Sequence, residues 1–127
     1  MRYLLDTNIL IWWFKQRKGL PSKIRQLIKD PNNEKYVSIV SLWEIVIKMN
    51  IKKLDLDYSI NEMIDDIFDS SIIILPIEVR YLEIYIHLPL IHKDPFDRFL
   101  ISTSIAEDIA LITSDEIIHQ YDVEWIW

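Results

Sequence analysis

Four acidic residues, far apart in the chain, each follow an apolar run and open a new element: Asp6, Glu44, Asp97 and Asp115. The runs before three of them have the composition of strands. In a parallel sheet, residues just past the strand ends line the crevice where such folds bind ligands. Carboxylates gathered there repel one another, and a divalent cation that prefers oxygen ligands relieves the repulsion. The pattern therefore points to metal-dependent phosphoryl chemistry.

Each acid also has a structural interpretation, because each lies near a predicted helix N-terminus, where carboxylates cap free N–H groups. Ser41 and Glu44 have the spacing of a capping box. Asp94 precedes Pro95, which favours the first helical position, so Asp94 is the expected N-cap and Asp97 is free to face the crevice. The functional interpretation rests on the coincidence of four acids at one edge of one sheet.

The elements that must position these acids alternate between strand and helix along the chain. Strands are expected over residues 2–5, 35–40, 72–75, 110–113 and 122–126. Helices are expected over 7–14, 41–50, 78–87, 95–108 and 115–120, with two more that begin near Pro21 and at Ser59. This alternation predicts an α/β fold with a parallel sheet, and the apolar strands predict that both faces are covered. The length of 127 residues predicts a single domain over 1–127.

Composition narrows the classes of protein. The chain has no cysteine, which argues against a disulfide framework and a thiolate zinc site. No apolar run reaches the length of a membrane span, and Asp6 interrupts the N-terminus too early for a signal-peptide core, so we expect a cytoplasmic protein. His87, His92 and His119 lack zinc-helix spacing and are interpreted as ordinary surface or core residues.

The formal charge of −6 is unevenly distributed. A basic segment without acidic residues contains Lys15, Arg17, Lys18, Lys23, Arg25 and Lys29. Such a segment has the charge expected of a surface that contacts a phosphate backbone, although a solvated helix face is the favoured interpretation of a charge run alone.

Four segments carry a resemblance to a known family. They are Tyr3-Leu4-Leu5-Asp6-Thr7-Asn8, Ser41-Leu42-Trp43-Glu44-Ile45, His92-Lys93-Asp94-Pro95-Phe96-Asp97-Arg98-Phe99-Leu100-Ile101 and Leu111-Ile112-Thr113-Ser114-Asp115. In this order and spacing the chain resembles PIN-domain ribonucleases of the VapC-like toxin group. The resemblance implies a Rossmann-like, three-layer fold with a mainly parallel sheet of about five strands. It also implies an acidic pocket for Mg²⁺ or Mn²⁺ and endonuclease activity on RNA.

The family's metal-site acids correspond to Asp6, Glu44, Asp97 and Asp115. Supporting positions correspond to Asn8, Arg98 and Thr113. The resemblance further implies products with a 5′-phosphate and a 3′-hydroxyl, a homodimer, and inhibition by a small antitoxin protein. Two other functions stay open: a metal-dependent DNA nuclease or phosphatase that uses the same acids, and a non-catalytic PIN-like module that binds proteins.

Two apolar segments bear on partners. Residues 9–14 are apolar all round a helix, so one sheet face cannot bury them all. Either other helices or a partner must cover the remainder. Residues 123–127 are expected to form an edge strand whose aromatic residues pack against the fold.

Overall fold

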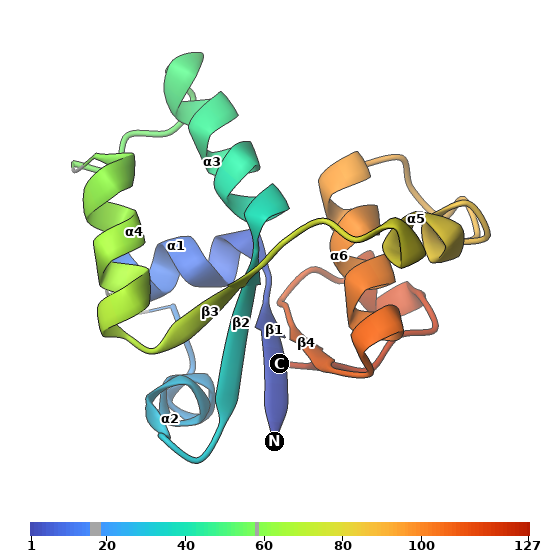
Figure 1. Ribbon diagram of the computed structural model, residues 1–127, viewed down its shortest axis with the longest axis horizontal. Coiled ribbons are helices and arrows are strands. Elements are labelled where there is room, and N and C mark those ends of the chain that lie inside the picture. Colours follow the sequence, from blue (N-terminus) through green and yellow to red (C-terminus); the bar gives the residue numbers. More distant parts are fainter. Residues whose placement is uncertain (16–18, 58) are drawn as a thin grey trace.

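The computed structural model describes residues 1–15, 19–57 and 59–127. Its centre is a sheet of five parallel strands in the order β3-β2-β1-β4-β5 (Figure 1). The strands are β1 (Arg2–Leu5), β2 (Glu34–Ser38), β3 (Ile72–Leu75), β4 (Ala110–Ile112) and β5 (Trp125–Ile126). Because all strands run the same way, their carboxyl ends share one edge of the sheet.

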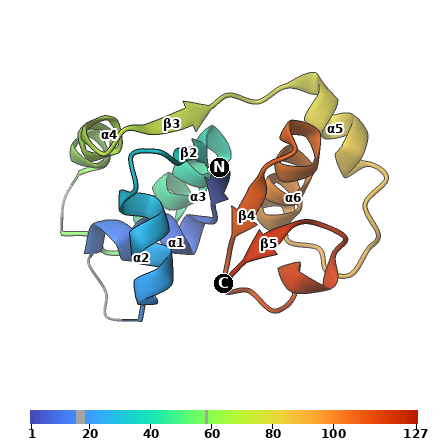
Figure 2. The same cartoon turned by 90° about the horizontal axis from the view of Figure 1, so that it is seen from below.

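Helices cover both faces of the sheet, as its apolar strands predict. They are α1 (Thr7–Lys15), α2 (Ser22–Lys29), α3 (Ile39–Asn50), α4 (Ile60–Asp69), α5 (Val79–Tyr85) and α6 (Pro95–Glu107), with a short 3₁₀ helix at Ile118–Gln120. Figure 2 shows α1 to α4 on one side and α5 and α6 on the other. The result is a three-layer α/β/α arrangement, as expected from the sequence.

Alternation along the strands divides the core into two parts. Tyr3 and Leu5 point into the larger cluster, which α1, α2, α3 and α4 complete. Leu4, between them, points to the opposite face, where it packs with Leu100 and Ile101 of α6. The central strand β1 is therefore buried on both sides, which fixes the position of Asp6, the residue that follows it.

Helix α1 is largely covered within the monomer. Ile9, Leu10 and Ile11 are buried, and the aromatic residues that follow pack partly against the same cluster. The ring of Trp12 lies 6.2 Å from that of Trp127. The C-terminal aromatic segment thus packs against the fold, as predicted, and supplies part of the cover.

Helix α3 begins earlier than the sequence predicts. The expected strand over 35–40 ends at Ser38, and the Ser38 hydroxyl caps the helix by accepting a bond from Val40 N at 3.0 Å. The predicted start at Ser41, with Glu44 as its capping-box partner, is wrong. Val40 packs against Tyr81 and Phe99 as part of the helix, so tertiary packing overrides its preference for a strand.

The starts of α4 and α6 agree with the sequence. Ser59 and Glu62 form the predicted capping box at the start of α4. Asp94 caps α6, with Pro95 in the first turn. Near the C-terminus the predicted elements are shorter: the helix expected over 115–120 is a single 3₁₀ turn, and β5 has two residues. Among the described helices, none is both long and apolar enough to cross a membrane.

Candidate active site

Asp6 directly follows the buried strand β1 and is 4% exposed. Its backbone N–H continues the ladder by donating to Ile112 O at 3.0 Å. That pairing brings it beside Thr113, whose hydroxyl donates to Asp6 Oδ2 at 2.7 Å. The sheet itself therefore fixes Asp6 and Thr113 side by side, although they are far apart in the sequence.

Thr113 also links Asp6 to Asp115. Its Oγ1 accepts a bond from Asp115 N at 3.1 Å, so one hydroxyl contacts both acidic segments. Asp115 Oδ1 in turn accepts from Ile117 N at 2.8 Å, which closes a tight turn after β4. Thr113, predicted as a supporting residue, therefore orders two of the four acids.

Asp97 lies in the first turn of α6, and its side chain is 19% exposed. Its backbone N–H donates to the capping carboxylate Asp94 Oδ1 at 2.9 Å. The Asp97 carboxylate instead meets a histidine, with Oδ2 at 3.1 Å from His92 Nε2. Asp94 is thus the N-cap, as predicted, and the Asp97 carboxylate takes no part in the cap.

Glu44 comes from the second turn of α3 and is 8% exposed. Its Oε2 lies 2.9 Å from Lys48 Nζ, one helical turn further on. The start of α3 is joined to the start of α1 by a bond from Thr7 Oγ1 to Ser41 Oγ at 2.9 Å. Ser41 thus joins α3, which carries Glu44, to α1, which follows Asp6.

Burial and, to a smaller extent, mutual repulsion raise the pKa of two of the acids. Burial raises the pKa of Asp6 to about 6, with Glu44 and Asp115 adding to the rise against bonds from Thr113 and Thr7. Burial raises the pKa of Asp97 to about 7, where the His92 bond lowers it and the charges of Asp6, Asp94 and Asp115 raise it. The acids from four parts of the chain therefore interact electrostatically at one edge of the sheet.

The chemistry of these donors fits Mg²⁺ or Mn²⁺, which favour carboxylate oxygens. One oxygen of each acid accepts a bond from a neighbouring group or pairs with Lys48, which orients the carboxylates. Within residues 1–15, 19–57 and 59–127, no three Asp, Glu, His or Cys side chains are grouped closely enough to hold one ion. The described structure thus brings the acids to a common edge without a closed ligand cage.

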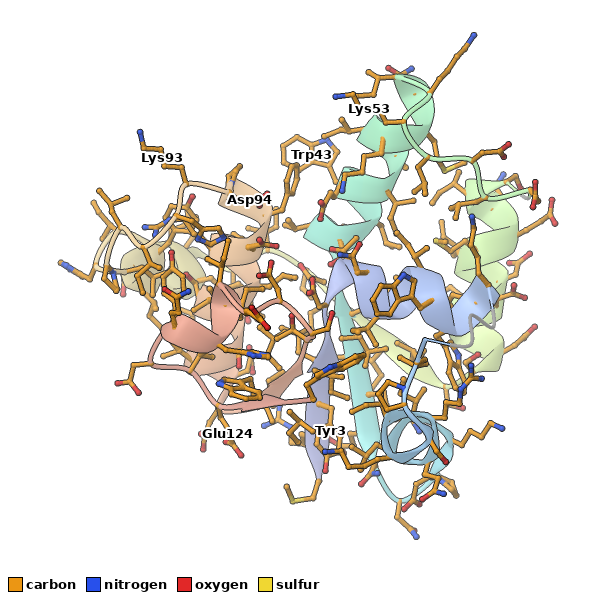
Figure 3. All side chains as sticks on the ribbon, turned by 180° about the vertical axis from the view of Figure 1, so that it is seen from behind. Tyr3, Trp43, Lys53, Lys93, Asp94 and Glu124 are labelled. Atoms are coloured by element: carbon orange, nitrogen blue, oxygen red, sulfur yellow. The ribbon has the colours of Figure 1, made fainter. Side chains whose placement is uncertain are left out.

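The rim of this edge is apolar. Figure 3 shows Trp43 on α3 close to Asp94 at the start of α6. Trp43 is 58% exposed, and its ring meets the edge of Phe96 at a centroid distance of 5.4 Å. This aromatic pair lines an open cavity of about 310 Å³, whose other lining residues are Val40, Ile77, Leu82, Tyr85, Pro95 and Phe99.

The helix of the basic segment that the structure describes, α2, lies away from the acids. In Figure 1, α2 sits toward the amino ends of the strands, away from the edge with the acids. Lys15 Nζ donates to Asp55 O at 2.7 Å, and Lys23 Nζ donates to Trp127 O at 3.0 Å. Arg17 and Lys18 lie outside the described residues. Lys15 and Lys23 therefore each have a structural partner within the fold.

Two of the supporting positions differ in role. Asn8 is exposed at the start of α1, whereas Arg98 is buried and donates from Nη1 to Pro89 O at 2.8 Å and to Tyr121 OH at 3.0 Å. Sequence reasoning missed His92 and Tyr121, because a lone histidine and a distant tyrosine carry no motif. The only available signal was the place of His92 next to the Asp94–Asp97 pair.

Comparisons with known proteins identify the family and the fold. Residues 3–124 match the PIN domain, and the chain belongs to this family. No curated protein matches the chain. Among solved structures, VapBC2 from Rickettsia felis bound to a promoter DNA fragment is 22% identical, with a TM-score of 0.74 over 99% of this chain and 98% of that one.

Two further structures show the same fold. VapBC-1 from nontypeable Haemophilus influenzae is 22% identical, with a TM-score of 0.68 over 99% of this chain and 97% of that chain. A toxin–antitoxin complex from Klebsiella pneumoniae is 22% identical, with a TM-score of 0.59 over 89% and 86%. The predicted resemblance to the PIN family and its three-layer fold is confirmed.

Proposed function

We propose that this PIN-domain protein is a metal-dependent endoribonuclease and the toxin of a toxin–antitoxin pair. The observation that carries the proposal is the convergence of Asp6, Glu44, Asp97 and Asp115 at the carboxyl edge of one sheet. Burial raises the pKa of Asp6 and Asp97 there, and the charges of neighbouring acids add to the rise. A structural cap needs only one acceptor, and Asp94 already fills that role for α6. Buried acids that repel one another cost stability, which favours a functional reason for them.

Each of the four acids would have its own role. Asp6 and Asp97 would bind the ion directly, Asp115 would bind it directly or through water, and Glu44 would orient the attacking water or accept its proton. Mg²⁺ or Mn²⁺ bound there would orient the phosphodiester, lower the pKa of a water and offset charge in the transition state. Thr113 would hold Asp6 in place, since its hydroxyl bonds Asp6 Oδ2. Cleavage would leave a 5′-phosphate and a 3′-hydroxyl.

Partners follow from the fold's relatives and from the exposed apolar surface. The similar structures from Rickettsia felis, Haemophilus influenzae and Klebsiella pneumoniae are described as VapBC or toxin–antitoxin assemblies, which supports a cognate antitoxin for this chain. The apolar cavity beside Trp43 supports a protein partner, and we propose a homodimer for the free toxin. Such a protein would act in the cytoplasm, where its RNA substrate is found.

The substrate class can be tested directly. Purified protein in Mn²⁺ should be offered structured RNA, single- and double-stranded DNA, and a small phosphate ester side by side. The proposal expects internal cuts in RNA and little turnover of the other substrates. Faster cleavage of DNA or of the ester would indicate the alternative enzymes. Loss of all cleavage, with antitoxin binding intact, would indicate the non-catalytic module.

A further inference from the structure

The loop between α5 and α6 places a histidine against a proposed metal ligand. His92 Nε2 lies 3.1 Å from Asp97 Oδ2, and its other ring nitrogen, Nδ1, lies 2.8 Å from Tyr121 OH. The His92 side chain is largely buried, as is Tyr121. Both ring nitrogens therefore have defined partners from different elements of the fold.

The donor and the acceptor of each of these hydrogen bonds can be assigned. Tyr121 OH accepts from Arg98 Nη1 at 3.0 Å and from His92 N at 3.3 Å, and these two donors occupy both lone pairs of the hydroxyl oxygen. Its single proton then goes to His92 Nδ1 at 2.8 Å, which is closer than His92 O at 3.5 Å. With Nδ1 as an acceptor, a neutral His92 carries its proton on Nε2.

The consequence is a directed series of bonds. Arg98 donates to Tyr121, Tyr121 donates to His92, and His92 Nε2–H donates to Asp97. Arg98 is itself fixed, because it is buried and its Nη1 also donates to Pro89 O at 2.8 Å. The buried guanidinium thus anchors the loop and, through two rings, one oxygen of the Asp97 carboxylate.

We propose that His92 is a positioning residue, which holds Asp97 Oδ2 through Nε2–H so that the other carboxylate oxygen is presented to a divalent cation. Tyr121 sets the tautomer that makes this possible. The inference rests on the proposed metal-dependent function and deepens it. Partners that orient a metal ligand typically contribute 10- to 100-fold in metal affinity.

A merely structural role predicts something different. His92 and Tyr121 also pack edge to face at 5.5 Å, so their replacement will lower stability in any case. Packing alone gives no reason for cation affinity to change in variants that still fold. It also gives no reason for a glutamine at position 92 to work better than an alanine, since only glutamine places an N–H donor near the position of Nε2.

The experiment measures the dissociation constant for Mn²⁺ on metal-free protein, from the free-ion signal in electron paramagnetic resonance. The test variants are His92→Ala, His92→Gln and Tyr121→Phe, and Asp97→Asn reports on the proposed ligand itself. Tyr36→Phe is a matched control that also removes a hydroxyl. Tyr36 OH donates to Glu34 Oε2 at 2.7 Å and has no bond to Asp97 or His92 among the described residues. Circular dichroism checks that each variant is folded.

We expect His92→Ala and Tyr121→Phe to bind Mn²⁺ about 10-fold or more weakly. His92→Gln should keep affinity within a few-fold, and Tyr36→Phe should match the wild type. Wild-type affinity in folded His92→Ala and Tyr121→Phe, with affinity lost in Asp97→Asn, would overturn this inference and leave the proposed function standing. Unchanged affinity in Asp97→Asn would overturn both.

A measurement on the wild type avoids the question of folding. Nitrogen NMR of neutral His92 in metal-free protein reports which ring nitrogen carries the proton. The series of bonds requires the proton on Nε2, with Nδ1 as an acceptor. A proton on Nδ1 would contradict the inference, because a deprotonated Nε2 has no hydrogen to donate to Asp97.

Discussion

Asp97 and Asp6 make the metal-free protein sensitive to pH. The pKa of Asp97 is raised to about 7 from an ordinary value of 3.8, and that of Asp6 to about 6. The folded state therefore holds these protons more tightly than the unfolded chain. The stability that they contribute is complete below about pH 4 and is lost as the pH rises through 6 and 7.

The first prediction concerns this dependence. In EDTA, the melting temperature should fall between pH 5 and pH 7.5 through these two acids. Asp97→Asn should melt higher than the wild type at neutral pH and show a shallower fall, because it removes one repelling charge and still accepts a bond from His92. Thermal melts across this range test it, and a wild-type curve as flat as that of the variant would show that the pKa of Asp97 is not raised.

The second prediction separates the two aspartates of α6. Asp94 caps the helix through Asp97 N, so Asp94→Ala should cost about 0.5–2 kcal/mol of unfolding free energy, measured by urea melts. Asp94→Ser should keep most stability and most RNA cleavage, because serine also caps well. An inactive Asp94→Ser together with an active Asp97→Asn would reverse these roles.

At this scale the sequence was informative where residue type and spacing carry the signal. Asp94 and Asp97 could be assigned because proline marks the first helical turn, and Asp6 because an apolar strand precedes it. His92 could not be assigned, since its partners Asp97, on a separate element, and Tyr121, 29 positions along, meet it only in the folded chain. Glu44 was expected to follow a strand over 35–40, but that strand ends at Ser38 and Glu44 lies in the second turn of α3.

The corrected start of α3 leads to a prediction for that element. Ser38 is the N-cap, so Ser38→Ala should lower the unfolding free energy by about 0.5–2 kcal/mol. Ser22→Ala is the control, since Ser22 begins α2 and its helix has no side-chain capping bond. Urea melts compare the two, and equal stability in both variants would argue against a cap at Ser38.

Most elements could be predicted from periodicity and from Pro, Ser and Asp at helix starts. The errors share a physical cause, which is that tertiary contacts outweigh local preference. Ile39 and Val40 favour a strand by composition but begin α3, where Val40 packs against Tyr81. After β4, the bond from Ile117 N to Asp115 Oδ1 makes a tight turn, and only Ile118–Gln120 becomes helical.

For the whole molecule, the charge distribution determines how a polyanion such as RNA can approach the acids. The net charge is −6, and the described basic residues of α2 lie away from the acids. A polyanion approaching this edge therefore meets negative charge unless a cation is present. This requirement agrees with the proposed metal and explains why the basic segment does not by itself locate an RNA surface.

Mass action gives the fourth prediction. An ion that binds only the folded protein stabilises it by about 2.7 kcal/mol at 100 times its dissociation constant. The melting temperature at neutral pH should therefore rise from EDTA to millimolar Mn²⁺ in the wild type. Asp97→Asn should lose this response. Equal shifts in both proteins would locate the ion away from Asp97.

In the proposed function, these four acids cleave RNA with the help of a cation. The most direct measurement is cleavage of a panel of structured RNAs by wild type and Asp97→Asn, each in EDTA and in Mn²⁺, with product ends analysed. We predict internal cuts with 5′-phosphate ends by the wild type in Mn²⁺ alone, and none by folded Asp97→Asn. Equal cleavage by the two proteins, or cleavage by the wild type that persists in EDTA, would contradict metal-dependent cleavage by these acids.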